Sequence, residues 1–209
     1  MRSLIVAAAM LLATPAFAAA GKFTVTSTDV KAGGTLGNKH VFNGMGCTGD
    51  NLSPQISWSN APEGTKSFAV TIYDPDAPTG SGWWHWVVYN IPADTKELAE
   101  GAGTAAGDKL PAGTVQGRTD FGAPGFGGAC PPPGDKPHHY KITVTALKVD
   151  KLDVPAEATA AYVGFMTHMN ALGSASITAT YARPTEKVAE PKKDAAKKEA
   201  DKPKETEKK

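Results

Sequence analysis

The chain has few cysteines, few aromatic residues and almost no net charge. Its 209 residues include two cysteines, 8% are aromatic, and the formal net charge is +1. Beyond the N-terminus, no stretch approaches the ~20 consecutive apolar residues of a membrane-spanning helix, so no membrane span is expected. The balanced charge also gives no reason to expect nucleic-acid binding by the folded part.

Motifs typical of common catalytic and metal sites are also missing. The sequence contains no C-x-x-C or H-x-x-x-H spacing, which zinc sites often use, and no G-x-S-x-G elbow of serine hydrolases. We therefore predict no cofactor and no bound metal. Spacing leaves one metal alternative open, a set of Asp74, His85 and His138 brought together from different strands.

The N-terminus has the pattern of a secretion signal. Met1-Arg2-Ser3 gives a positive start, Leu4 to Leu12 are nine apolar residues, and Ala16-Phe17-Ala18 is a small-x-small cleavage pattern. We predict that residues 1–18 are removed and that the mature protein is periplasmic or secreted.

The C-terminus has a different composition from the rest of the chain. From Glu186 to Lys209 there are nine lysines, seven acidic residues and no aromatic residue. Such a segment has too little apolar area to fold, so residues 185–209 are predicted to form a disordered, solvated tail. Residues 19–184 remain, which is the size of one domain with its own core.

Alternating and β-branched runs predict a β-rich domain with few helices. The expected strands are 23–26, 40–42, 55–58, 67–73, 83–91, 114–116, 139–147 and 176–181. The runs at 67–73 and 83–91 are apolar on both faces, which predicts central strands.

One convincing helix is expected near the C-terminus, over 156–169. Tyr162, Phe165, Met166 and Met169 recur at helical spacing, and we expect this stripe to face the core. A short helical turn is also expected over 94–99.

Two segments place polar, proton-bearing side chains beside prolines at strand ends. The first is Asp74-Pro75-Asp76-Ala77-Pro78, followed by a strand whose period of two puts Trp83, His85 and Val87 opposite Trp84, Trp86 and Val88. The second is Cys130-Pro131-Pro132, followed by His138-His139-Tyr140, in which His138 and Tyr140 share a face. If the strands are neighbours, these groups converge and offer N–H and O–H donors to an oxyanion.

Three other polar residues are expected to have structural roles rather than roles in a site. His40 and His168 are expected to be structural, and Asp76 is expected to cap its turn.

Motifs along most of the chain resemble those of the phosphatidylethanolamine-binding protein family, also called the Raf kinase inhibitor-like family. They are the run 46–54, the Asp-Pro-Asp-Ala-Pro block with its Trp and His, the run 113–122, the Pro-Pro/His-x-Tyr block, and His168 with its following strand. The resemblance covers roughly residues 23–183. It implies a mainly β fold, with a large central antiparallel sheet flanked by a smaller sheet and with peripheral helices.

The resemblance also implies a small anion pocket. Its ligand-binding residues would be Asp74, His85, His138 and Tyr140, with Trp83 as the floor and the backbone of Pro131 and Pro132 as the wall.

The two cysteines, Cys47 and Cys130, leave two alternatives. An even count in an exported protein favours a disulfide. Relatives without export signals carry cysteines at these places, so free thiols packed near the pocket stay open.

The leading hypothesis is a non-enzymatic periplasmic binding or regulatory protein for phosphate-like anions or phosphorylated head groups. A protein partner is a further expectation from the resemblance, and the oligomeric state is left open, with a homodimer among the options. The alternatives are a protease inhibitor acting through loops 104–112 or 123–137, and a weak hydrolase that uses His85 and Asp74.

Overall fold

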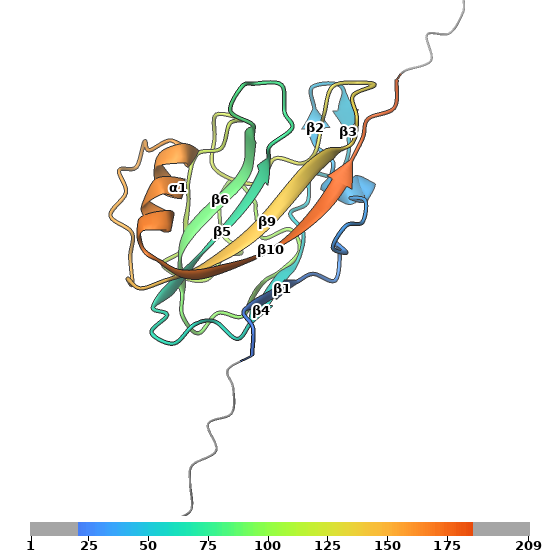
Figure 1. Ribbon diagram of the computed structural model, residues 1–209. Coiled ribbons are helices and arrows are strands. Elements are labelled where there is room, and N and C mark those ends of the chain that lie inside the picture. The colour runs from blue at the N-terminus through green and yellow to red at the C-terminus, as the bar shows by residue number, and fades with distance from the viewer. Residues whose placement is uncertain (1–20, 186–209) are drawn as a thin grey trace, which may run out of the picture.

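A computed structural model of the protein describes residues 21–185 (Figure 1). The predicted signal peptide and the predicted tail after Thr185 lie outside the described residues. The described part is a β-rich fold built around one large antiparallel sheet, as predicted.

The large sheet has five strands and the smaller sheet has three. In spatial order the large sheet contains β10 (Ala171–Tyr181), β9 (His138–Leu147), β5 (Ser67–Asp74), β6 (Trp83–Pro92) and β8 (Val115–Gln116). The smaller sheet contains β1 (Thr24–Thr26), β4 (Ile56–Ser59) and β7 (Glu97–Leu98). The remaining elements are the hairpin β2 (Asn43–Gly44) and β3 (Cys47–Thr48), the 3-10 turn η1 (Asn38–His40) and the helix α1 (Ala160–Met169).

The main core lies between the two sheets. Apolar side chains from one face of the large sheet, including Phe68 and Ile142, pack against Ile56, Trp58 and Leu98 of the smaller sheet. The opposite face of the large sheet is partly covered by α1 (Figure 1). The strands expected at 67–73 and 83–91 were predicted to be central, and with the strand expected at 139–147 they form the centre of this arrangement.

Helix α1 presents the face opposite to the one we predicted. Tyr162, Phe165 and Met169 are 44%, 58% and 56% exposed. Only Met166 of the predicted stripe packs against the core, beside the buried Val163. The expectation that the aromatic and methionine stripe faces the core is therefore wrong.

Close packing of α1 on the sheet explains this orientation. A Cβ added at Gly164 would lie 3.7 Å from the ring of Trp84. The face that meets the sheet also carries the buried Ala160 and Thr167. Small side chains let the helix approach closely, so the larger side chains point outward. The helix begins at Ala160, where the hydroxyl of Thr159 accepts a hydrogen bond from the backbone N–H of Tyr162.

Two local predictions outside α1 are also wrong. The segment 94–99 contains the strand β7 rather than a helical turn, because Leu98 is buried and pairs with Ile56 of β4. The segment 40–42 is the end of η1 followed by a single bridge from Val41 to Ala129, rather than a strand.

A β-bulge interrupts β6 at His85. Ile72 of β5 pairs with Trp86, whereas the next residue, Tyr73, pairs with Trp84. His85 is therefore an extra residue in β6, and a bulge of this kind redirects side chains along its strand.

The bulge changes which side chains share a face. The ring of His85 contacts the ring of Tyr140, and Tyr140 lies in the same core as Trp86. Val87, which we expected to share the face of His85, packs instead in the cluster beneath α1. The predicted alternation is wrong beyond His85, because regular period-two spacing contains no extra residue.

A matched pair of Phe-to-Ala substitutions tests the assignment of core and surface. Phe68→Ala removes a fully buried ring, and we expect it to lower the free energy of unfolding by about 3–5 kcal/mol. Phe165→Ala removes an exposed ring, and we expect a change within about 0.5 kcal/mol. Urea denaturation followed by fluorescence measures both values. A large loss for Phe165→Ala would show that α1 is packed the other way.

Candidate functional site

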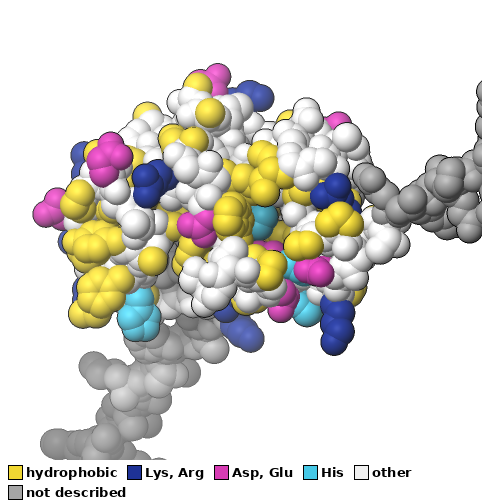
Figure 2. Space-filling model, turned by 90° about the horizontal axis from the view of Figure 1, so that it is seen from above, with side chains coloured by type: hydrophobic (Ala, Val, Ile, Leu, Met, Phe, Trp, Pro, Cys, Tyr) yellow, Lys and Arg dark blue, Asp and Glu magenta, His cyan; other side chains and the backbone are white. Residues whose placement is uncertain are grey.

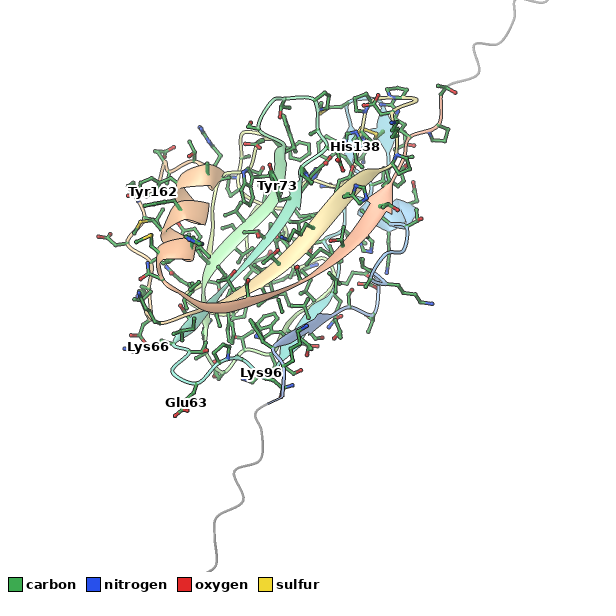
Figure 3. The ribbon with its side chains drawn as sticks, in the orientation of Figure 1. Glu63, Lys66, Tyr73, Lys96, His138 and Tyr162 are labelled. Carbon is green, nitrogen blue, oxygen red and sulfur yellow. A yellow bond between two sulfur atoms is a disulfide. The ribbon has the colours of Figure 1, made fainter. Side chains whose placement is uncertain are left out.

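A cavity of about 190 Å³ opens where β5 ends and β9 begins. Figure 3 shows His138 at this end of β9, and Figure 1 shows the β2–β3 hairpin beside it. The seven predicted site residues all line the cavity: Asp74, Trp83, His85, Pro131, Pro132, His138 and Tyr140. The structure therefore brings together side chains from β5, β6, β9 and the segment before β9.

A buried hydrogen bond joins the ends of β5 and β9. His138 Nδ1 lies 2.7 Å from Asp74 Oδ2, and both side chains are almost completely buried. The other oxygen, Asp74 Oδ1, accepts a hydrogen bond of 2.8 Å from the backbone N–H of Asp76. On its far side, His138 Nε2 lies 3.4 Å from Asp135 Oδ2. Asp74 therefore holds the imidazole of His138 at the cavity wall.

The orientation of His85 is set by the main chain of the opposite loop. Its Nδ1 lies 2.7 Å from the carbonyl oxygen of Gly127. Because a carbonyl only accepts, Nδ1 must carry a proton and donate it. Burial lowers the pKa of His85, while the carbonyl groups of Gly127 and Gly128 and the charge of Asp74 act in the opposite direction. The ring is therefore neutral near pH 7.

Tyr140 places a phenol in the cavity lining without a partner. The residue is 2% exposed, and its hydroxyl forms no hydrogen bond within residues 21–185. Burial and then the charge of Asp74 raise the pKa of Tyr140 far above its ordinary value. The phenol therefore stays protonated, and a buried O–H without a partner is rare in folded proteins.

Apolar and aromatic side chains form the rest of the wall. The ring of Trp83 meets that of Phe121 edge-on at 5.4 Å, and Phe121 also contacts the ring of His85. Sequence reasoning missed Phe121 and Met45 as lining residues. Phe121 lies within the run 113–122 that carried the resemblance, so a signal for it existed, whereas Met45 had none.

The two cysteines join in a disulfide that borders the cavity. Cys47 in β3 and Cys130 are bonded with an S–S distance of 2.04 Å and a Cα–Cα distance of 6.0 Å. Cys130 lines the cavity directly before Pro131 and Pro132. The disulfide therefore connects the β2–β3 hairpin to the proline wall. Figure 2 views this end of the molecule, where hydrophobic side chains gather around acidic and histidine side chains.

The three residues that we expected to have structural roles, Asp76, His40 and His168, lie outside the cavity. Asp76 Oδ2 accepts hydrogen bonds of 2.7 Å from both the backbone N–H and Nδ1 of His139, which ties the β5 turn to β9. His40 is buried, and its Nδ1 donates to the carbonyl of Leu52. His168 is exposed at the end of α1.

The alternative of a metal site at Asp74, His85 and His138 is not supported by the positions of these side chains. Asp74, His85 and His138 line one cavity, but within residues 21–185 no three His, Cys, Asp or Glu side chains are grouped to hold a metal ion.

Comparison with known proteins places this chain in a family. The family model described as "Phosphatidylethanolamine-binding protein" matches residues 26–182, which is most of the chain. The chain belongs to the phosphatidylethanolamine-binding protein family. Its members are binding proteins in general terms, and the fold and the arrangement of motifs agree with this assignment.

This chain aligns with nearly the whole length of several relatives in this family. The UPF0098 protein YbcL of Escherichia coli is 55% identical over 181 residues, which are 87% of this chain and 98% of YbcL. The crystal structure of E. coli YBCL, described as a new member of the mammalian PEBP family, aligns with a TM-score of 0.76 at 57% identity, covering 78% of this chain and 99% of that chain. The Chlamydia trachomatis homologue CT736 aligns with a TM-score of 0.64 at 28% identity, covering 77% and 97%.

A Mycobacterium tuberculosis relative, 34% identical over 135 residues that are 65% of this chain and 62% of that protein, is named putative lipoprotein LppC. None of the helices in the described part of the chain is long and apolar enough to cross a membrane.

The neutral state of His85 predicts a dependence of stability on pH. Burial lowers the pKa of His85 in the folded state below its ordinary value of 6.5. As the pH falls below 6.5 the unfolded chain therefore binds this proton first, and stability is lost by up to about 1.4 kcal/mol per pH unit until the folded-state pKa is reached. We expect His85→Gln to lose less stability than the wild type between pH 6.5 and 5, measured by urea denaturation. Parallel curves for the two proteins would contradict a neutral, buried His85.

Proposed function

We propose that this protein is a non-enzymatic, exported binding protein whose cavity takes a small phosphate-like anion or a phosphorylated head group. The observation that carries the proposal is Tyr140, a protonated phenol that lines the cavity and whose buried hydroxyl has no partner among residues 21–185. A ligand oxygen would satisfy it.

A second polar group beside Tyr140 supports a polar ligand. The imidazole of His138 lines the same cavity and is held there by the hydrogen bond from its Nδ1–H to Asp74 Oδ2. Each hydrogen bond to a charged ligand group contributes about 1.5–3 kcal/mol. After the cost of association is subtracted, a few such bonds give affinities on the order of micromolar to millimolar.

The size of the cavity favours a head group over a whole lipid. Its volume is about 190 Å³, whereas pockets for drug-sized ligands span roughly 300–1,000 Å³. A phosphate or a phosphoethanolamine group fits such a space, and acyl chains would remain outside. The apolar rim, including Met45, Phe121 and Trp83, gives such a ligand's carbon atoms a surface to contact.

Export to the periplasm is part of the proposal. The N-terminal pattern is that of a cleaved secretion signal, and the mycobacterial relative carries the name of a lipoprotein. The disulfide between Cys47 and Cys130 fits an oxidising compartment. A regulatory role through a protein partner belongs to the same proposal as an expectation from the family resemblance.

The contacts of His85 and Asp74 favour binding over hydrolysis. A hydrolase using these two residues needs the carboxylate to orient His85, but Asp74 bonds to His138, and His85 bonds to the carbonyl of Gly127. Such a hydrolase also needs a nucleophile bonded to its base. The hydroxyl of Thr79 lines the cavity, but it donates to the carbonyl of Gly82 rather than to His85. No specific contact favours the protease-inhibitor alternative through loops 104–112 or 123–137.

Removing one oxygen atom tests this proposal. Tyr140→Phe keeps the ring and deletes the unpartnered hydroxyl, so we expect the free protein to keep its stability or to gain slightly. We expect its affinity for phosphate and phosphoethanolamine to fall roughly tenfold, the effect of about 1.4 kcal/mol. Isothermal calorimetry and thermal melts measure both effects.

Tyr89→Phe is the matched control, because Tyr89 is also buried but packs in the cluster beneath α1. Its phosphate affinity should equal that of the wild type. If wild type and Tyr140→Phe respond identically to phosphate, or not at all at tens of millimolar, the cavity is not an anion site. In that case a panel of periplasmic proteases tests inhibition.

A further inference from the structure

One ring nitrogen of His85 is left as an acceptor for a ligand. Nδ1 donates to the carbonyl of Gly127, so in the neutral ring Nε2 carries a lone pair. Nε2 forms no hydrogen bond to any of the described residues, and the ring lines the cavity beside Tyr140. The cavity therefore contains an acceptor as well as donors.

The surroundings of His85 favour this neutral form. The nearby carboxylates are Asp74 at the end of β5 and Asp120 in the loop after β8, and both would favour a charged ring. From β9 the ring faces Tyr140, with His138 in the same cavity, and His40 lines a second, smaller cavity that His85 and Tyr140 also line. Because His85 is 4% exposed, burial outweighs the two carboxylates and lowers its pKa.

The charge of the cavity does not suit a dianion. Among its described lining residues there is no lysine or arginine, and Asp74 supplies a negative charge. The imidazole of His138 already lies between the carboxylates of Asp74 and Asp135. The nearest cation is the guanidinium of Arg183, which lies outside the lining and donates to the carbonyl of Met45. A second negative charge on the ligand would therefore be only partly compensated in a poorly solvated site.

These contacts point to a ligand that still carries a proton. We propose that the cavity selects a singly protonated oxyacid, above all a phosphate monoester in its monoanionic form, whose P–OH donates to His85 Nε2 while another oxygen accepts from Tyr140. This deepens the proposed anion-binding function and rests on it. A phosphodiester has no such proton, so the free or terminal phosphoryl group is favoured over the phosphodiester of an intact phospholipid.

Two esters of equal charge and similar shape separate this proposal from anion binding in general. At pH 5.5 methyl phosphate is mostly a monoanion with one P–OH, because the second pKa of a phosphate monoester is about 6. Methyl sulfate is also a monoanion but has no proton to donate. Calorimetric titration of the full mature chain should show methyl phosphate binding at least tenfold more tightly, with dimethyl phosphate as weak as methyl sulfate.

The pH dependence gives a second readout. Between pH 6 and 8 the monoanionic fraction of methyl phosphate falls about 50-fold, as follows from its second pKa of about 6. The affinity for total methyl phosphate should fall by the same factor. Methyl sulfate keeps its charge over this range, so its weak binding should stay nearly constant. Protonation of His85 on binding would instead make both esters bind well at low pH and lose affinity together.

A variant at His85 tests the assignment to this residue. His85→Gln replaces the fixed acceptor by an amide that can rotate to donate, and it should narrow the preference for methyl phosphate to less than threefold. His40→Gln is the matched control, because His40 is also buried with Nδ1 bonded to a carbonyl but lies outside this cavity. It should keep the full preference.

Each result decides between the two proposals. Equal affinity of the wild type for the two methyl esters overturns the selection of a protonated ligand and leaves anion binding standing. Failure of both esters to bind at any pH overturns anion binding as well. The comparison of esters on the wild type is decisive even if His85→Gln does not fold.

Discussion

The buried contact between Asp74 and His138 is the constraint on which the cavity depends. It joins the last residue of β5 to the first residue of β9, and breaking such a buried pair by removing one partner typically costs about 3–5 kcal/mol. A second contact, between Asp76 and His139, ties the same strand ends on the exposed side. Tyr140 follows two residues later on the same face as His138, so its hydroxyl is placed by the same constraint.

The opposite wall is positioned by close packing of main chain. A Cβ added at Gly128 would lie 2.5 Å from the carbonyl oxygen of His40, and one added at Gly49 would lie 2.2 Å from that of Val41. Glycine at both positions therefore lets these segments touch, which places the carbonyl of Gly127 against His85. The Cys47–Cys130 disulfide closes the same region covalently. The donor and acceptor pattern of His85 is thus a consequence of backbone packing around it.

Sequence reasoning located the central strands and the convergence of the site, but not the details that decide its chemistry. Apolar runs buried on both faces identify β5 and β6, and the alternation of apolar and polar residues identifies β9. The bulge at His85 leaves no such pattern, since it depends on how two strands pair. The stripe on α1 was misassigned because the small residues around Gly164 satisfy the same helical spacing and allow closer packing. The ring nitrogen of His85 that carries the proton is set by a carbonyl 42 residues away.

The unpaired hydroxyl of Tyr140 connects stability to binding. A buried polar group without a partner costs about 1–3 kcal/mol relative to a satisfied one. A phenylalanine at this position would avoid the cost while filling nearly the same space between His85 and the core. A ligand oxygen that reaches the hydroxyl recovers this free energy, which then contributes to affinity. His85 Nε2 has the opposite polarity, because in the neutral ring it is an acceptor and pairs with a ligand that brings a proton. A single protonated ligand can therefore pair with both the Tyr140 hydroxyl and His85 Nε2.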